Sequence, residues 1–271
     1  MKEESQNLNP SFAYLDEESL KVAEYVRNDI LSQELSHKKE SDDFAAVLVD
    51  GRDKRFGDEY ELAALKAIKL HSEYNYPILL FLNENYCKGI LSEQIIKEYR
   101  IQILPIKPIL NWPAVSEFHV FHLYDTIDSK YENLLIFQVD GFPIKSGWEN
   151  FVVDFGYIGA HWQHYARVDC GLSLPPTCIG NGGFSFRKLS KMREINKAVR
   201  HLPMKELGKD NFPPEDCYYS YFGFGLGICN PPSLEECDTF SIEPIDLNIY
   251  HNKKPFGFHK FINKNPYIRT T

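Results

Sequence analysis

Acidic side chains stand at several places in this chain where they could bind a cation or move a proton. The apolar run LLIFQVDGFPI, residues 134–144, contains a single acid, Asp140, directly before Gly141. If a buried strand ends there, it presents the Asp140 carboxylate as the hard oxygen ligand that Mg²⁺ or Mn²⁺ prefers. Asp-Gly is also a common turn pair, so a turn without any ligand is the alternative interpretation.

A glycine-rich segment, CIGNGGFSFR at residues 178–187, could bring backbone close to a ligand. Asn181, Gly182 and Gly183 tolerate a positive φ, and glycine leaves room for close approach. Because the segment precedes a helical pattern, free N–H groups there could meet an anion or a sugar hydroxyl. The alternative is a tight loop in front of a helix.

Two adjacent acids follow two prolines in PPEDCYY, residues 213–219. Successive side chains point in different directions, so Glu215 and Asp216 cannot share one role. One of them could take a proton from an acceptor hydroxyl while the other caps the following turn. Acids after prolines are also favoured at the start of a helix, which is the alternative.

A late histidine, His259, stands among aromatic residues in KPFGFHKF, residues 254–261. It could ligate a metal, with Lys260 or Lys254 near a phosphate group. A purely structural histidine is the alternative.

The elements that must position these residues alternate along the first half. Apolar runs predict strands over 44–50, 76–84, 101–106 and 134–140, and helical periodicity predicts helices over 20–35, 60–70, 91–100 and 113–127. This alternation indicates an α/β fold with a mostly parallel central sheet flanked by helices. Ligands of such sheets bind at the carboxyl ends of the strands, where Asp50 and Asp140 would flank one pocket.

The second half is rich in glycine, proline and aromatic residues, and only residues 187–202 read clearly as a helix. We therefore expect a loop-rich half over 146–271 after a more regular half over 41–145. Residues 1–40 are polar and charged and are predicted to form a helical extension outside this single domain.

Bulk composition narrows the class of protein. A formal net charge of -8 disfavours general binding of nucleic acid. No apolar run approaches the roughly 18 residues needed to span a bilayer. The six cysteines form no CxxC pair, and the N-terminus has no apolar leader segment. We expect reduced thiols and a cytoplasmic location.

Taken in order, these segments resemble sugar-nucleotide glycosyltransferases of the GT-A fold. They are similar in particular to a GT-A-like group long known as a domain of unknown function, over residues of about 44 to 262. The motifs that carry the resemblance are QVD, YIGAHW, GNGGFS, the Glu-Asp pair and GFHK.

The resemblance implies a role for each candidate residue. It implies Asp216, or else Glu215, as the catalytic base, and Asp140 and His259 as ligands of a divalent metal, Mn²⁺ or Mg²⁺. The residues implied to bind the nucleoside-diphosphate sugar are Asp50, Gly51, Arg52, Gln138 and Asp140. The residues implied to bind substrate on the acceptor side are Trp162, Asn181, Gly182, Gly183 and Lys260.

The implied activity is transfer of a sugar to a hydroxyl of a glycan or glycolipid, with inversion at the anomeric carbon. A glycolipid acceptor would bring the protein to a membrane surface without crossing it. One departure affects the metal: Gln138 stands where the usual Asp-x-Asp motif has its first acid. The alternative is therefore a non-catalytic sugar-nucleotide- or carbohydrate-binding protein with a decayed GT-A site.

Overall fold

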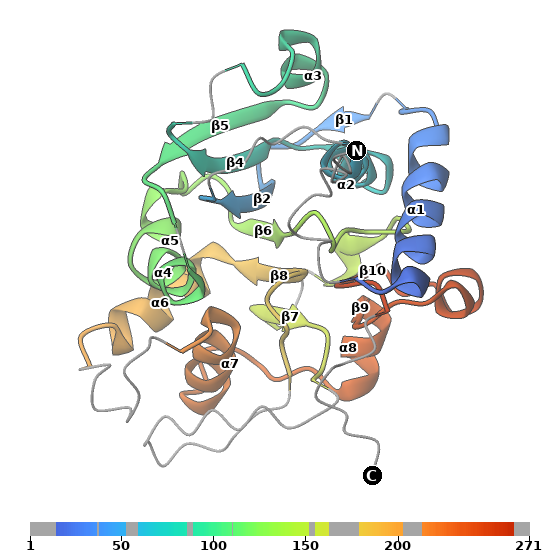
Figure 1. Ribbon diagram of the computed structural model, residues 1–271. Helices are drawn as coiled ribbons and strands as arrows, with labels where there is room; N and C mark the ends of the chain where they lie inside the picture. The colour runs from blue at the N-terminus through green and yellow to red at the C-terminus, as the bar shows by residue number, and fades with distance from the viewer. Residues whose placement is uncertain are drawn as a thin grey trace, which may run out of the picture.

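A six-stranded sheet forms the centre of the molecule (Figure 1). The structure, a computed structural model, describes residues 15–36, 38–52, 59–85, 89–109, 111–151, 155–162, 179–202 and 213–262. The strands in their spatial order are β5 (Ile101–Ile106), β4 (Ile78–Asn83), β2 (Phe44–Asp50), β6 (Asn133–Ile136), β8 (Ser185–Lys188) and β7 (Tyr157–Gly159).

The sheet is mostly parallel, as the sequence predicts. Strands β5, β4, β2 and β6 are paired in parallel. Strand β8 is antiparallel to both β6 and β7, so it alone of the six runs against the others. Two short parallel pairs lie outside this sheet, β1 (Lys39–Glu40) with β3 (Tyr74–Asn75), and β9 (Ser241–Ile242) with β10 (Gly257–Phe258).

The long apolar runs form strands because both faces of the sheet are covered. In β2, Ala46 and Leu48 belong to one hydrophobic cluster, while Ala45 and Val47 belong to another. This alternation matches the twofold side-chain repeat of a strand. A strand buried on both faces has no polar side, which explains the uninterrupted apolar sequence.

Helices cover the two faces in separate groups (Figure 1). The first cluster includes buried residues of α1 (Glu17–Ser32), α2 (Glu59–Leu70) and α8 (Leu234–Phe240). The second includes residues of the π-helical segment η1 (His119–Leu123), α5 (Tyr124–Thr126), α6 (Leu189–Val199) and α7 (Glu215–Gly225). The remaining helices among the described residues are α3 (Glu93–Glu98), α4 (Trp112–Phe118), the 3-10 turn η2 (Trp148–Phe151) and the π-helical turn η4 (Ile249–Lys253).

Local signals place the predicted helix starts correctly. The Ser92 side chain accepts a hydrogen bond from the Ile95 N–H and caps α3, as predicted. Pro113 lies in the first turn of α4, where its missing N–H costs no hydrogen bond. None of the described helices has the length and apolar character needed to cross a membrane.

The second half is more regular than predicted. Helix α8 forms where the sequence suggested a loop, and α7 begins at Glu215, as the alternative interpretation of that segment predicts. Strand β8 covers Ser185–Lys188, where a loop running into a helix was predicted. Helix α7 buries Tyr218, Tyr219 and Phe222 in the second cluster. Aromatic residues have only a modest helix propensity, and burial of these side chains offsets it. A prediction from sequence patterns alone does not include this contribution of burial.

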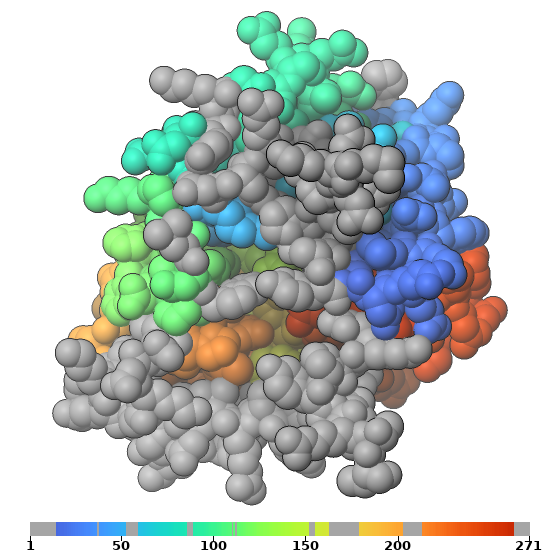
Figure 2. All heavy atoms as spheres, in the orientation of Figure 1, coloured from blue at the N-terminus to red at the C-terminus, as the bar shows by residue number. Residues whose placement is uncertain are grey.

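Helix α1 packs into the shared core. Its buried residues Val22, Ala23, Val26 and Ile30 join the first cluster together with residues of α2 and β4. The Tyr250 hydroxyl donates to the Asp29 carboxylate, which joins α1 to η4. Figure 2 shows the blue atoms of α1 beside the red atoms of the C-terminal part. The predicted extension over 1–40 thus contributes one helix to the core, while the domain limits stay a prediction.

We predict that Ile30→Ala lowers the free energy of unfolding by about 2–5 kcal/mol, because it leaves a cavity where a fully buried side chain packs. Urea denaturation measures this loss. Glu24→Ala on the exposed face of α1 is the matched control and should change stability by less than about 0.5 kcal/mol. Equal stability of both variants would mean that α1 is not part of the cooperative core.

Candidate active site

Asp140 lies at the tip of a tight turn that follows β6. The strand ends at Ile136, and Gln138 and Gly141 exchange two backbone hydrogen bonds of 3.0 and 3.1 Å. The prediction of a strand through Asp140 is therefore wrong, because the segment forms a turn; the binding of a ligand at this turn stays a prediction. The turn still leaves Asp140 partly exposed beyond the carboxyl end of β6.

Asp50 ends the neighbouring strand β2 and binds Arg52. The Asp50 carboxylate accepts from Arg52 Nε at 2.8 Å and from Arg52 Nη2 at 2.9 Å. Burial alone would lower the pKa of Arg52, but Asp50 raises it, and the charge of Asp140 acts in the same direction. Asp140 thus lies within electrostatic reach of Arg52, at the sheet edge where the sequence predicts both acids.

Packing against Ile109 leaves no room for a side chain at residue 51, which is glycine. A Cβ atom built on it would lie 2.6 Å from Ile109 Cβ. This contact explains a glycine at residue 51 without a ligand, and its predicted role in binding a nucleotide stays a prediction.

The segment Asn181–Gly183 enters β8 and touches two other parts of the chain. A Cβ on Gly182 would lie 2.3 Å from Glu215 Oε1, and one on Gly183 would lie 2.0 Å from His259 Nε2. The Asn181 side chain accepts from the Gly183 N–H at 3.0 Å and donates to Glu243. The two glycines thus allow β8 to approach both α7 and the C-terminal segment.

Arg187 of β8 is fully buried and pairs with Glu215 at the start of α7. Its Nη2 lies 2.8 Å from Glu215 Oε1, and its Nη1 donates to the Tyr124 hydroxyl at 2.7 Å. The guanidinium also lies 5.0 Å from the ring centre of Tyr157 and 5.5 Å from that of Tyr219. A buried charge needs such partners, because leaving it unpaired is costly.

The ion pair with Arg187 gives the two adjacent acids, Glu215 and Asp216, different pKa values. Burial alone would raise the pKa of Glu215, but Arg187 holds it below its ordinary value. Burial and the neighbouring Glu215 charge raise the pKa of Asp216 to about 6. The Asp216 carboxylate accepts from the N–H groups of Gly182 at 3.2 Å and Cys217 at 2.7 Å, which fix its position. Of the two acids predicted as a base, only Asp216 has a pKa near neutral pH.

Lys260 joins the remaining candidates into one group. Its Nζ lies 2.7 Å from Glu243 Oε1, and its backbone N–H donates to the Asp140 carbonyl at 2.8 Å. Burial alone would lower the pKa of Lys260, but Glu243, Asp140 and Asp216 raise it. We call Lys260, Glu243, His259, Asp140 and Asp216 the Lys260 cluster. It reaches the surface at the Lys260 side chain, which is 50% exposed.

Glu243 is the member of this cluster that the sequence did not indicate. It binds Lys260 and Asn181, and its Oε1 lies 3.5 Å from His259 Nδ1. Burial alone would raise the pKa of Glu243, but His259 and Lys260 lower it to about 2. A single Glu before a proline carries no recognisable pattern, so no local signal could have found it.

The two predicted metal ligands, Asp140 and His259, both belong to the Lys260 cluster, and their role at a metal stays a prediction. The described residues contain no group of three or more His, Cys, Asp or Glu that could hold a metal ion. His259 Nε2 lies 3.2 Å from Gln138 Oε1, so Gln138 contacts the histidine that was predicted to share a metal with Asp140. These contacts do not fit a preformed metal site.

Trp162, predicted on the acceptor side, is partly exposed. It follows His161, whose Nδ1 lies 2.7 Å from Asp238 of α8. Asp238 also lines a recess of about 400 Å³. The other residues that line this recess are Lys145, Glu235, Thr239, Ile242, Lys253, Lys254 and Pro255.

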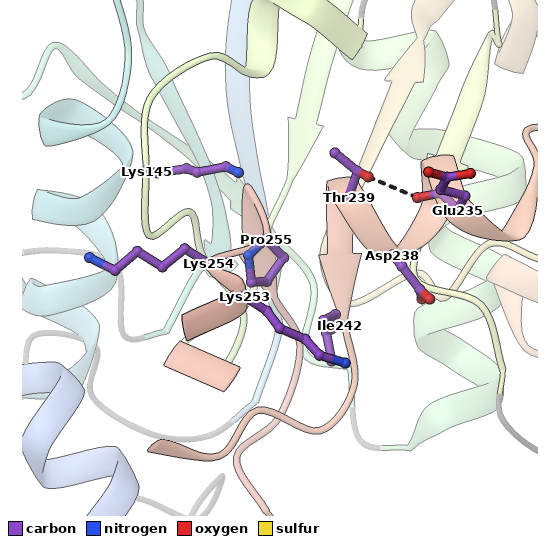
Figure 3. Close-up of a pocket in the computed structure, with 8 residues that line it drawn as sticks. All are labelled: Lys145, Glu235, Asp238, Thr239, Ile242, Lys253, Lys254 and Pro255. Atoms are coloured by element: carbon purple, nitrogen blue, oxygen red, sulfur yellow. Dashed lines mark hydrogen bonds between the residues drawn. The ribbon is translucent and has the colours of Figure 1, made fainter. Parts of the chain in front are cut away.

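Of the residues that the sequence singles out, Lys254, suggested to lie near a phosphate group, lines this recess, while the predicted acids, His259 and Lys260 do not. Figure 3 shows Lys145, Lys253 and Lys254 with their side chains pointing in different directions, so the ammonium groups do not converge on one ligand. We therefore place the candidate active site at the Lys260 cluster and not in the recess.

Comparisons with known proteins match this chain to one protein family. The family described as "Protein of unknown function (DUF5672)" matches residues 98–259. No curated protein matches the chain. The apo form of mouse xyloside xylosyltransferase 1 is similar in structure, with 9% identity, a TM-score of 0.46, and coverage of 80% of this chain and 97% of that chain. That identity is too low to transfer residue roles.

We predict that Arg187→Met and Glu215→Gln each lower the free energy of unfolding by about 3–5 kcal/mol, because each leaves one buried charge unpaired. The double variant should lose clearly less than the sum of the single losses. Arg200→Met is the matched control, since its pair with Asp125 is exposed and should contribute at most about 1 kcal/mol. Additive losses in the urea-unfolding cycle would contradict a coupled pair.

Proposed function

The chain belongs to the DUF5672 family, whose match covers more than half of its residues, and we propose that it is a glycosyltransferase that uses a nucleoside-diphosphate sugar. The observation that carries the proposal is the unequal pair of acids at the start of α7. Arg187 keeps Glu215 ionised, while the pKa of Asp216 rises to about 6 beside Gly182. A carboxylate with that pKa is a competent base at neutral pH.

In the proposed reaction, Asp216 accepts the proton of an acceptor hydroxyl. The acceptor oxygen forms a bond to the anomeric carbon of the donor sugar on the face opposite the nucleotide. The bond from that carbon to the diphosphate oxygen breaks, and the nucleoside diphosphate leaves with the electron pair. A single displacement of this kind inverts the anomeric configuration, so a product with retained configuration would refute this mechanism.

The donor side of the proposal rests on the Lys260 cluster and its neighbours at the sheet edge. Lys260 and Arg52 are cations near Asp140, and a protonated amine or guanidinium can bind phosphate oxygens. A divalent Mn²⁺ or Mg²⁺ remains part of the prediction from the family resemblance. No step above depends on it.

The acceptor is proposed to be a glycan or glycolipid, bound on the side of Asn181–Gly183 and Trp162. A cytoplasmic protein that touches a membrane surface would suit a glycolipid acceptor. The alternative function is a non-catalytic sugar-nucleotide- or carbohydrate-binding protein, which the contact between Gln138 and His259 favours.

We predict that one nucleoside diphosphate or its sugar conjugate raises the stability of the protein by about 2.7 kcal/mol at 100 times its dissociation constant. A thermal-shift panel with and without Mn²⁺ measures this effect. Asp140→Asn should reduce the shift, while Asp125→Asn, which changes an exposed acid, should retain it. Release of nucleoside diphosphate in the presence of acceptor then separates a transferase from a binding protein.

We predict that the transfer rate rises about tenfold per pH unit below pH 6 and levels off above it. Deprotonated Asp216 is the active form, and burial together with Glu215 raises its pKa to about 6. Steady-state kcat/KM between pH 4.5 and 8 measures the profile. Asp216→Asn should abolish transfer while nucleotide binding persists. A wild-type rate that stays constant down to pH 4.5 would exclude Asp216 as the base.

A further inference from the structure

His259 lies where four segments of the chain meet. Its ring touches the turn at Gly141 and the loop at Gly183, where added Cβ atoms would lie 3.0 Å and 2.0 Å from ring atoms. Its two nitrogens face Gln138 and Glu243. The residue is 5% exposed, so these contacts enclose nearly all of it.

Neither ring nitrogen is placed to bind a cation. Nε2 lies 3.2 Å from the Gln138 side-chain oxygen, so a cation could reach this nitrogen only by displacing Gln138. Nδ1 is shielded from solvent and faces Glu243 Oε1 at 3.5 Å. The same carboxylate oxygen lies 2.7 Å from the Lys260 ammonium, so a positive charge of the protein already occupies the cation position there.

We infer that His259 is a positioning residue and not a metal ligand: with Glu243 it locks the Asp140 turn to the Asn181–Gly183 loop. The ammonium of Lys260 takes the place of a bound cation beside Glu243. The inference rests on the proposed function only in treating Asp140 as a residue that faces the donor.

Backbone hydrogen bonds connect His259 and Lys260 to the turn at Asp140. The His259 N–H donates to the Ile242 carbonyl at 3.1 Å, and the next residue, Lys260, donates its N–H to the Asp140 carbonyl at 2.8 Å. On the other side, Glu243 accepts from Asn181, whose oxygen accepts from the Gly183 N–H. A change at Glu243 should therefore reach Asp140 and Gly183 through these intervening residues.

The first experiment needs no substitution. The ¹⁵N resonances of the His259 imidazole are recorded in the wild-type protein while ¹¹³Cd²⁺ is added, with and without a nucleoside diphosphate. We expect the shifts of both ring nitrogens to be unchanged by Cd²⁺. A large shift or a splitting of the His259 signal by ¹¹³Cd would show that it is a ligand and overturn the inference.

The second experiment tests positioning through Glu243→Gln, which keeps the size of the side chain and leaves His259 in place. We expect the amide resonances of Asp140 and Gly183 to move. We also expect the affinity for nucleoside diphosphate to fall about tenfold, equally in EDTA and in Mn²⁺, as for outer-sphere partners of a binding group. Glu235→Gln, from the separate recess, is the control and should change neither.

The outcomes separate the two proposals. Unmoved Asp140 and Gly183 amides in Glu243→Gln would overturn the lock. A loss of affinity that appears only with Mn²⁺ would also overturn it, because a metal site would then depend on Glu243. If the wild-type protein binds no nucleotide at all, the proposed function fails, while the Cd²⁺ titration and the amide shifts still decide the role of His259.

Discussion

The buried ion pair of Arg187 and Glu215 is the constraint on which the second half of the molecule depends. A guanidinium with no solvent contact can be tolerated only if nearly every donor finds an acceptor. Ser185, Tyr124, Gly182 and Glu215 provide those acceptors, and each comes from a fixed place in the fold. Strand β8 must therefore lie in the sheet, and α7 must begin against it. The ion pair also requires glycine at residue 182, because a side chain there would collide with Glu215.

The ion pair also decides which chemistry the adjacent acid can perform. An aspartate in water has a pKa near 4 and accepts protons poorly at neutral pH. Asp216 is buried beside a carboxylate that Arg187 keeps charged, and these conditions raise its pKa without removing its hydrogen bonds to Gly182 and Cys217. One structural charge pair thus converts a neighbouring side chain into a better base.

The sequence predicts what local patterns control. The runs that form β2 and β4 are apolar on both faces, so strands and a parallel sheet follow from them, and Ser92 and Pro113 mark helix starts. The patterns fail where tertiary contacts decide. Helix α7 consists of aromatic residues and glycines that become helical only by packing in the second cluster. Glu243 could not be found because its partners, Asn181 and His259, are brought to it only by the fold. Asp140 itself was found, but the turn that carries it was predicted as strand.

The distribution of charge in the Lys260 cluster limits how a donor could bind. Three carboxylates, Asp140, Asp216 and Glu243, act on one ammonium, that of Lys260. A diphosphate adds further negative charge, and a like charge nearby favours the protonated form of an acid. Donor binding would therefore raise the pKa of Asp216 unless a cation lies between the two. Lys260 binds Glu243 and lies within electrostatic reach of Asp216, so in the proposed reaction its ammonium would offset part of the phosphate charge. In the proposed reaction, a base and a leaving-group side that share one ammonium would favour an ionised Asp216 while the donor is bound.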